Sequence, residues 1–412
     1  MALAACGGSN PPPIVDAGTP SACVGGGGGT VVGQVIDGYG QGISGVTVVE
    51  SSRSTTTNVN GCFTFTGVAR PYDIAVVRTA ASSPKVASVY SQLTRTDPKL
   101  RDLSVLGSPA RRATVGGTLV GTFPGPGGAT TAVAFASPES SVGNYVSALP
   151  WSIDVGWAGP SSTTGSLHVL QWTTDMKGTL TSVVSHGVRS GVTLSNGGST
   201  SNADLTLMPV TGPGGVSGTI ALPSGYTLGS RTAYLTFADG AGFPVSDDTL
   251  SSTSFALPVP TSIGASILFT ATAVDGLSQQ STAQLFGLAP GTSNAVLTLP
   301  LAAVATAPAN GATGVDVTTP FTWTPVAGGV TIVAMTGQGT DPVFFLVSGG
   351  STSHIPDLSA QGLGLGAGRT YGWTVVGLGP FASVDAFTAT GTLPPEGLGF
   401  QTISQRYSFT TK

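Results

Sequence analysis

The segments Thr30-Val-Val-Gly-Gln-Val-Ile36 and Ile43-Ser-Gly-Val-Thr-Val-Val49 alternate apolar residues with small or polar ones. Alternation with a period of two places every second side chain on the same face of a β-strand. Asn60-Gly61 follows, a dipeptide that favours tight hairpin turns, and Cys62-Phe-Thr-Phe65 then alternates again. These segments predict short antiparallel strands with one buried face, beginning after the glycine run at 25–29.

The composition of the whole chain is typical of exported β-proteins. Of its 412 residues, 61 are Gly and 29 are Pro, and only 8% are charged, against about 25% in an average soluble domain. No run reaches the roughly 18 apolar residues of a membrane-spanning helix, because Thr, Ser and Gly interrupt the apolar positions. The length suits three or four domains. We therefore expect an all-β protein of tandem antiparallel β-sandwich modules.

Charge is sparse and unevenly distributed. Residues 1–112 hold nine of the 15 basic residues and six of the 19 acidic ones, a net +3, and the remainder carries −7. A nucleic-acid-binding surface needs a dense basic stripe, whereas Arg111-Arg112 is an isolated pair that we expect in a solvated linker. We therefore expect no nucleic-acid partner.

The opening segments fit the pattern G-x-V-x-D-x-x-G-x-x-I-x-G-V-x-V, followed by a hairpin of the type T-x-x-N-G-x-F-x-F and a strand containing Tyr. The matching residues are Gly33, Val35, Asp37, Ile43, Gly45, Val46, Val48, Asn60, Gly61, Phe63, Phe65 and Tyr72. Over about residues 29–106 the chain thus resembles the carboxypeptidase regulatory-like domain, a transthyretin-like sandwich. The resemblance implies an accessory module at 29–110 rather than a catalytic one.

Segments 111–211 and 212–302 look like two copies of one module. Val115-Gly-Gly-Thr-Leu119 corresponds to Val216-Ser-Gly-Thr-Ile220, and Thr200–Leu207 corresponds to Thr292–Leu299. Both copies open with the alternation seen in the first module, so we expect two related sandwiches. Chance similarity between Thr- and Leu-rich segments is the alternative.

The segment 303–412 contains Phe321-Thr-Trp323 and, after a Leu- and Gly-rich turn, Tyr371-Gly-Trp373-Thr-Val375. These motifs resemble the second and sixth strands of a fibronectin type III-like, immunoglobulin-type module. The resemblance implies that Trp323 and Trp373 pack across two facing sheets. Arg406-Tyr-Ser-Phe-Thr410 is the expected closing strand.

Residues 1–28 contain an N-terminal motif, Leu3-Ala-Ala-Cys6-Gly7, that resembles the lipobox of bacterial lipoproteins. The resemblance implies lipidation of Cys6, anchoring in a membrane and, from Gly7, sorting to the outer membrane. The Pro- and Gly-rich residues that follow are typical of a disordered tether. Only five residues precede Cys6, fewer than a signal peptide needs, so this interpretation expects residues upstream of Met1; a chance match is the alternative.

The other two cysteines, Cys23 and Cys62, predict one disulfide in an oxidising compartment. Two free thiols are the alternative. The three histidines, His168, His186 and His354, are scattered along the chain and no Cys-x-x-Cys motif occurs, so we expect no metal site.

Fragments that resemble catalytic or cofactor motifs have simpler interpretations. Gly362-Leu-Gly-Leu-Gly-Ala367 mimics a dinucleotide-binding motif, but a strand rather than a helix is expected at 369–376. Asp247-Asp248 is expected in a solvated turn rather than in a calcium site. The Glu residues form no cluster in the sequence. We therefore expect no cofactor and no enzymatic activity.

Trp151, Trp157 and Trp172 lie in the second module. An exposed row of indole rings would form a platform for stacking sugars, whereas core packing is the simpler interpretation for residues that are usually buried. Both remain open from the sequence.

Three functions follow from these expectations. The first is a structural or adhesive lipoprotein at the outer membrane or cell surface, with a protein partner. The second is an extracellular polysaccharide-binding protein that uses the tryptophans of the second module. The third is a hydrolase whose carboxylates are dispersed in the sequence.

Overall fold

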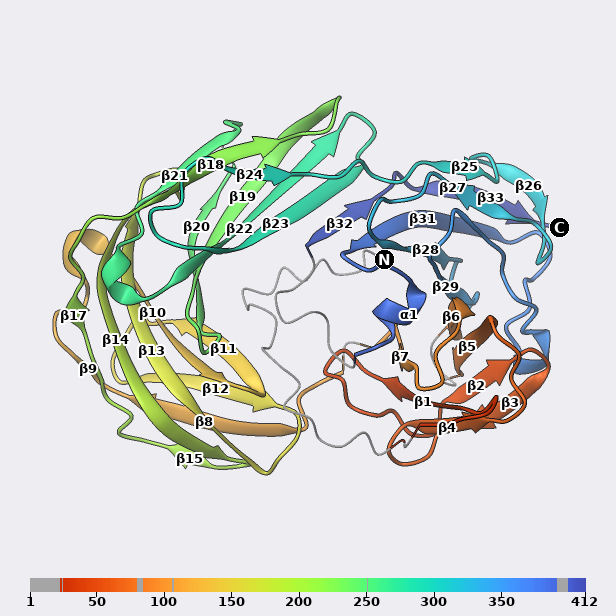
Figure 1. Ribbon diagram of the computed structural model, residues 1–412, viewed down its shortest axis with the longest axis horizontal. Coiled ribbons are helices and arrows are strands. Elements are labelled where there is room, and N and C mark those ends of the chain that lie inside the picture. The colour runs from red at the N-terminus through yellow and green to blue at the C-terminus, as the bar shows by residue number, and fades with distance from the viewer. Residues whose placement is uncertain (1–22, 24, 80–83, 106, 250, 391–398) are drawn as a thin grey trace.

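The computed structural model describes residues 23, 25–79, 84–105, 107–249, 251–390 and 399–412, and its fold is all-β (Figure 1). The described residues contain one short α-helix, α1 (Val384–Phe387), and none of their helices has the length and hydropathy to cross a membrane. Three 3₁₀ turns lie between strands: η1 (Pro126–Gly128), η2 (Thr261–Ile263) and η3 (Ser359–Gln361). The all-β expectation is therefore confirmed.

The first module pairs its strands in two sheets. In the order β4-β1-β7, β1 is antiparallel to β4 and parallel to β7. The second sheet runs β3-β2-β5-β6 with antiparallel neighbours. The strands are β1 (Val31–Ile36), β2 (Thr47–Glu50), β3 (Arg53–Thr56), β4 (Cys62–Phe65), β5 (Tyr72–Arg78), β6 (Val86–Leu93) and β7 (Lys99–Arg101).

The second module has the same topology. Its first sheet is β12-β8-β15, again with a parallel first and last strand, and its second is β11-β10-β13-β14 with β17 added at the edge. The strands are β8 (Arg111–Gly117), β9 (Leu119–Val120), β10 (Thr130–Ser137), β11 (Ser140–Tyr145), β12 (Trp151–Trp157), β13 (Ser162–Thr174), β14 (Leu180–Ser195), β15 (Ser199–Thr200), β16 (Leu205–Thr206) and β17 (Met208–Pro209).

The third module repeats the topology once more, as β21-β18-β24 and β20-β19-β22-β23. The matching sequence segments thus form the first and last strands of each copy, which lie side by side and parallel. The strands are β18 (Val216–Ala221), β19 (Tyr226–Thr236), β20 (Gly242–Asp248), β21 (Ser254–Leu257), β22 (Ser266–Asp275), β23 (Gln280–Leu288) and β24 (Ala295–Thr298).

The fourth module is an immunoglobulin-type sandwich. One sheet is β25-β27-β30; the other contains β29-β28-β31-β33, with β26 parallel to β33. Trp323 and Trp373 come from the two facing sheets and share one core, in which Phe321 contacts Trp373 at 5.1 Å between ring centroids. The strands are β25 (Ala305–Ala307), β26 (Ala312–Val315), β27 (Phe321–Trp323), β28 (Val330–Thr336), β29 (Val343–Ser348), β30 (Thr352–Ser353), β31 (Thr370–Gly379), β32 (Phe400–Ile403) and β33 (Tyr407–Thr411).

A continuous 14-stranded sheet joins the third, fourth and first modules. β23 pairs with β32, and β29 runs parallel to β6 from Val343↔Val86 to Val347↔Tyr90. Around β6 and β29 this sheet is covered on both faces, by β4-β1-β7 on one side and β25-β27-β30 on the other. Such strands need apolar residues at consecutive positions, and all six residues of β29 are buried. The first and fourth modules are therefore fused, and they form one of the two lobes in Figure 1.

Helix α1 adds a second contact between these modules. Asp385 accepts hydrogen bonds from the Thr94 amide at 2.9 Å, from the Thr94 hydroxyl and from the Arg95 amide at 3.2 Å. Phe387 packs against Tyr90 with 6.4 Å between ring centroids. Polar and apolar contacts thus fix the segment after β31 on the first module.

The second and third modules form the other lobe and also share a core. β10 is buried almost throughout, because its outward face packs against the hairpin formed by β19 and β20. Ala132 and Ala134 are small enough for this close approach, and Trp172 contacts Phe243 at 6.5 Å between ring centroids.

Two sequence expectations were wrong. Arg111 and Arg112 begin β8 instead of lying in a solvated linker. Asp247 and Asp248 end β20, and the buried Asp248 carboxylate pairs with the Arg231 guanidinium at 2.8 Å. A buried charge needs such a partner, and the sequence did not indicate one seventeen residues away.

Candidate anchoring site and titratable groups

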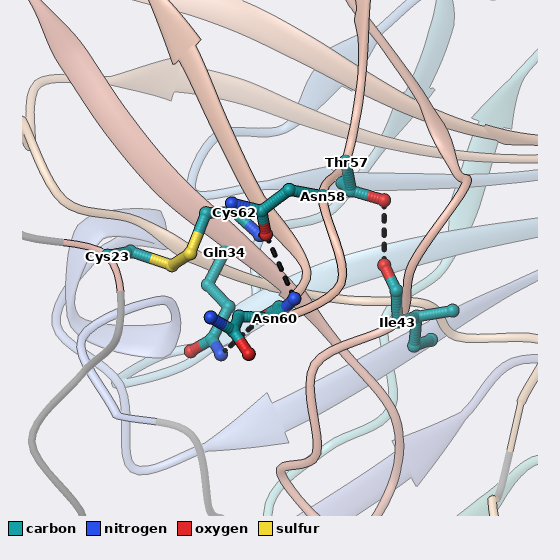
Figure 2. The surroundings of a disulfide bond; sticks show 7 residues. All are labelled: Cys23, Gln34, Ile43, Thr57, Asn58, Asn60 and Cys62. Atoms are coloured by element: carbon teal, nitrogen blue, oxygen red, sulfur yellow. Dashed lines mark hydrogen bonds between the residues drawn. A yellow bond between two sulfur atoms is a disulfide. The ribbon is translucent and has the colours of Figure 1, made fainter.

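The predicted disulfide is present between Cys23 and Cys62 (Figure 2). The two Cα atoms are 5.5 Å apart, within the range that a disulfide spans, and 39 positions separate them in the sequence. Cys62 begins β4, the edge strand of the first sheet of the first module. The bond therefore fixes the chain that enters this module to a strand of its sandwich, and the glycine run at 25–29 lies inside the closed loop.

A polar hairpin turn holds Cys62 in place (Figure 2). Asn58 Oδ1 accepts the amide hydrogens of Asn60 at 2.9 Å and of Cys62 at 3.0 Å. Gly61 adopts φ 76°, the left-handed conformation expected of Asn-Gly turns. From the neighbouring strand, Gln34 Nε2 donates to the Asn60 carbonyl at 2.9 Å. The Asn60-Gly61 prediction is thus confirmed.

A cavity of about 440 Å³ lies next to the disulfide. Its walls are residues 32–34 of β1, the segment around Asp97 and Lys99, and Ala389 of the fourth module. The Asp97 carboxylate is paired with Arg95 at 2.7 Å. The cavity is therefore polar at one side, and its charged carboxylate has a partner.

The tryptophans of the second module form no platform. Trp151, Trp157 and Trp172 are 3%, 1% and 2% exposed. Trp151 and Trp157 point inward from β12, and their indole nitrogens donate to the carbonyls of Thr118 and Pro160. The sugar-stacking interpretation of these residues is therefore wrong, because their ring faces are covered by the core.

Sequence analysis missed a cluster on the outward face of the second module. His168 Nε2 lies 2.8 Å from Asp239 Oδ2, and His168 Nδ1 lies 3.2 Å from His186 Nε2. Phe237 packs against both imidazoles, at 4.5 and 4.6 Å between ring centroids. The histidines are not scattered in space, because β13 and β14 pair Leu170 with His186 and bring the two rings together.

Burial sets the electrostatics of this cluster. His168 is 4% exposed. Burial, followed by the adjacent His168, lowers the pKa of His186 from 6.5 to about 4, although Asp239 opposes this change. Burial tends to raise the pKa of Asp239, but the hydrogen bond with His168 and the positive charge that His168 can carry lower it overall.

Cys6, the proposed lipidation site, lies outside the described residues. The lipid anchor and the membrane as a partner therefore stay predictions from the sequence.

Comparison with known proteins identifies no family. No protein-family model and no curated protein matches this chain. Among solved structures, the Bacillus anthracis TIE protein is 9% identical over 66% of this chain, with a TM-score of 0.16, and this chain spans only 50% of its length. The chicken CNTN1 FN1–FN3 domains are 9% identical over 69% of this chain and 88% of their own, with a TM-score of 0.17. These weak likenesses go no further than a β-rich, multi-sheet architecture.

Proposed function

We propose that this protein is a non-catalytic, lipid-anchored protein of the bacterial outer membrane or cell surface, with a structural or adhesive role. Its sandwiches would be held away from the membrane by the segment that follows Cys6. The polysaccharide-binding alternative loses its support, because the tryptophans on which it rested are buried.

The observation that carries the proposal is the Cys23–Cys62 disulfide. Structural disulfides are typical of proteins that fold outside the cytosol. This bond also lies where a tether would enter the first sandwich, so tension on the tether would load β4 directly and bypass the glycine run.

The architecture supports a structural role. The first and fourth modules share two cores, and the second and third share another. Shared cores restrict motion between modules far more than flexible linkers do. The topology of the first module supports its assignment as a carboxypeptidase regulatory-like accessory domain, and the sheets of the fourth support a fibronectin type III-like one.

Mass spectrometry of the protein isolated from the cells that make it tests the anchor. We expect Cys6 to be the first residue and to carry a diacylglycerol and an acyl chain, and we expect the protein to partition with membranes. The Cys6→Ala variant should lose both properties, whereas Cys23→Ser should keep the lipid. An unmodified chain that begins at Met1 would overturn the anchor and the proposed location.

A further inference from the structure

The row Asp239–His168–His186 crosses from the third module to the second. Asp239 lies in the turn between β19 and β20, whereas His168 and His186 lie on β13 and β14. His168 occupies the middle, with one ring nitrogen facing Asp239 and the other facing His186. We call the contact of this turn with the two histidines the histidine seam.

The geometry restricts where protons can lie. With His168 neutral, Nε2 donates to Asp239, so the bare Nδ1 must accept the hydrogen on His186 Nε2. With His168 protonated, both its nitrogens donate, and His186 Nε2 must be the bare acceptor. In either arrangement His186 is neutral.

A second added proton has no acceptable position. If both rings are protonated, His168 Nδ1–H and His186 Nε2–H face each other across 3.2 Å. The hydrogen bond is then lost, and two positive charges share a site that contains one carboxylate. The stacked Phe237 ring excludes water from both imidazoles and offers no acceptor.

We propose that the histidine seam is an acid-sensitive contact, in which double protonation of His168 and His186 separates the β19–β20 turn from the second module. Separation relieves the repulsion because it opens both rings to water. It also exposes Phe237, which is 8% exposed in the closed form. The device is thus a conformational switch between modules, independent of the lipid anchor.

The groups around His186 set the direction of the pH effect. The titratable groups that act on it are His168 on β13 and Asp239 in the covering turn. Across the sheet, β10 places Ala134 opposite His168, and β17 places Met208 opposite His186; neither residue is charged. A base whose pKa falls from 6.5 to about 4 on burial binds fewer protons in the closed form, so acid favours opening between these values.

Hydrogen exchange of the turn measures the opening. In the closed form Phe237 donates its amide hydrogen to Ala241 at 2.9 Å, and Gly240 donates to Phe237 at 2.9 Å. After correction for intrinsic exchange rates, the open population should rise roughly tenfold between neutral pH and about pH 5.5. The strand β28, remote from the seam, should show no such rise. Equal acceleration in β28, or none in the turn, would overturn the proposal.

Two variants should shift the response in opposite directions. His186→Gln keeps an amide that can donate to His168 but cannot be protonated, so it should remove the response. Asp239→Asn removes the compensating charge and should move the response to higher pH. His354→Gln changes an exposed histidine outside the seam and is the matched control, which should behave as the unmodified protein. If the response persists unchanged in His186→Gln or is unmoved in Asp239→Asn, the proposal fails.

Discussion

At the scale of single residues, one side-chain oxygen shapes several hairpins. In four turns, Oδ1 of an Asp or Asn accepts the amide hydrogens of the residues two and four positions later, at 2.8–3.0 Å. The residue just before the end of each turn has a positive φ, which residues with a Cβ adopt only at a cost. The turns begin at Asp37, Asn58, Asp175 and Asp275, and the positive-φ residues are Gly40, Gly61, Gly178 and Ser278.

Ser278 is the exception in this group, with φ 64° and an exposed side chain. We expect Ser278→Gly to stabilise the protein by about 0.5 kcal/mol, because relief of the left-handed strain exceeds the extra entropy of the unfolded chain. Denaturant unfolding measures the change. Ser278→Ala, which removes the hydroxyl but keeps the Cβ, should give no gain; an equal gain would show that strain is not the cause.

The disulfide allows a second test at this scale. Closing a loop of 39 positions restricts the unfolded chain by up to about 4 kcal/mol. Cys23→Ser and Cys62→Ser should therefore lower the melting temperature by similar amounts, because either change removes the same bond. The double variant should lose no more than either single variant. Additive losses would contradict a shared origin of the two effects.

At the scale of elements, the β13–β14 hairpin docks on a strand of the next module. The Gly178 carbonyl accepts the Asp247 amide hydrogen at 3.1 Å and the Ser246 hydroxyl at 3.2 Å. A Cβ at position 178 would lie only 2.2 Å from the Asp247 carbonyl oxygen. The tip of this hairpin thus needs glycine for space as well as for its φ of 83°.

A matched pair of glycines separates these two needs. Gly197 also has a positive φ, 73°, but nothing lies within 4 Å of the position where its Cβ would be. Gly197→Ala should cost about 1 kcal/mol through strain alone. Gly178→Ala should cost roughly 1–3 kcal/mol more, because the Asp247 backbone must move. Equal losses in denaturant unfolding would show that the contact between the modules adapts freely.

Local elements were largely predictable from the sequence, and contacts between modules were not. Alternation identified β1 and β4, and Asn-Gly identified the turn before β4, because these signals lie within a few residues. The pairing of β6 with β29 joins Val86 to Val343, and no local rule connects such distant positions. One available signal was the unbroken apolar run of β29, since a strand covered on one face alone would alternate.

The histidine seam was hidden from the sequence for the same reason. Residues 168 and 186 are brought together by the long β13–β14 hairpin, which contains register shifts, so counting positions does not pair them reliably. Asp239 comes from another module. The disulfide could be predicted, because an exported chain with two remaining cysteines leaves one pairing.

At the scale of the whole molecule, module order in space differs from order in the sequence. The continuous sheet runs from the third module through the fourth to the first, so the last module lies beside the first (Figure 1). One buried cluster contains Ala87 and Val89 of the first module together with Leu346 of the fourth. Because the two modules complete each other's cores, they should unfold as one cooperative unit.

Two leucine truncations test this cooperativity. Leu346 on β29 and Leu194 on β14 are both 0% exposed, but Leu194 belongs to a cluster made only of second-module residues. Each change to Ala should cost about 2–5 kcal/mol through lost burial and a residual cavity. Leu346→Ala should accelerate hydrogen exchange in β5 of the first module as well as in β31 of the fourth, whereas Leu194→Ala should leave β5 unchanged. If Leu346→Ala affects β31 alone, the first module is stable without the fourth, and the continuous sheet joins independently folding units.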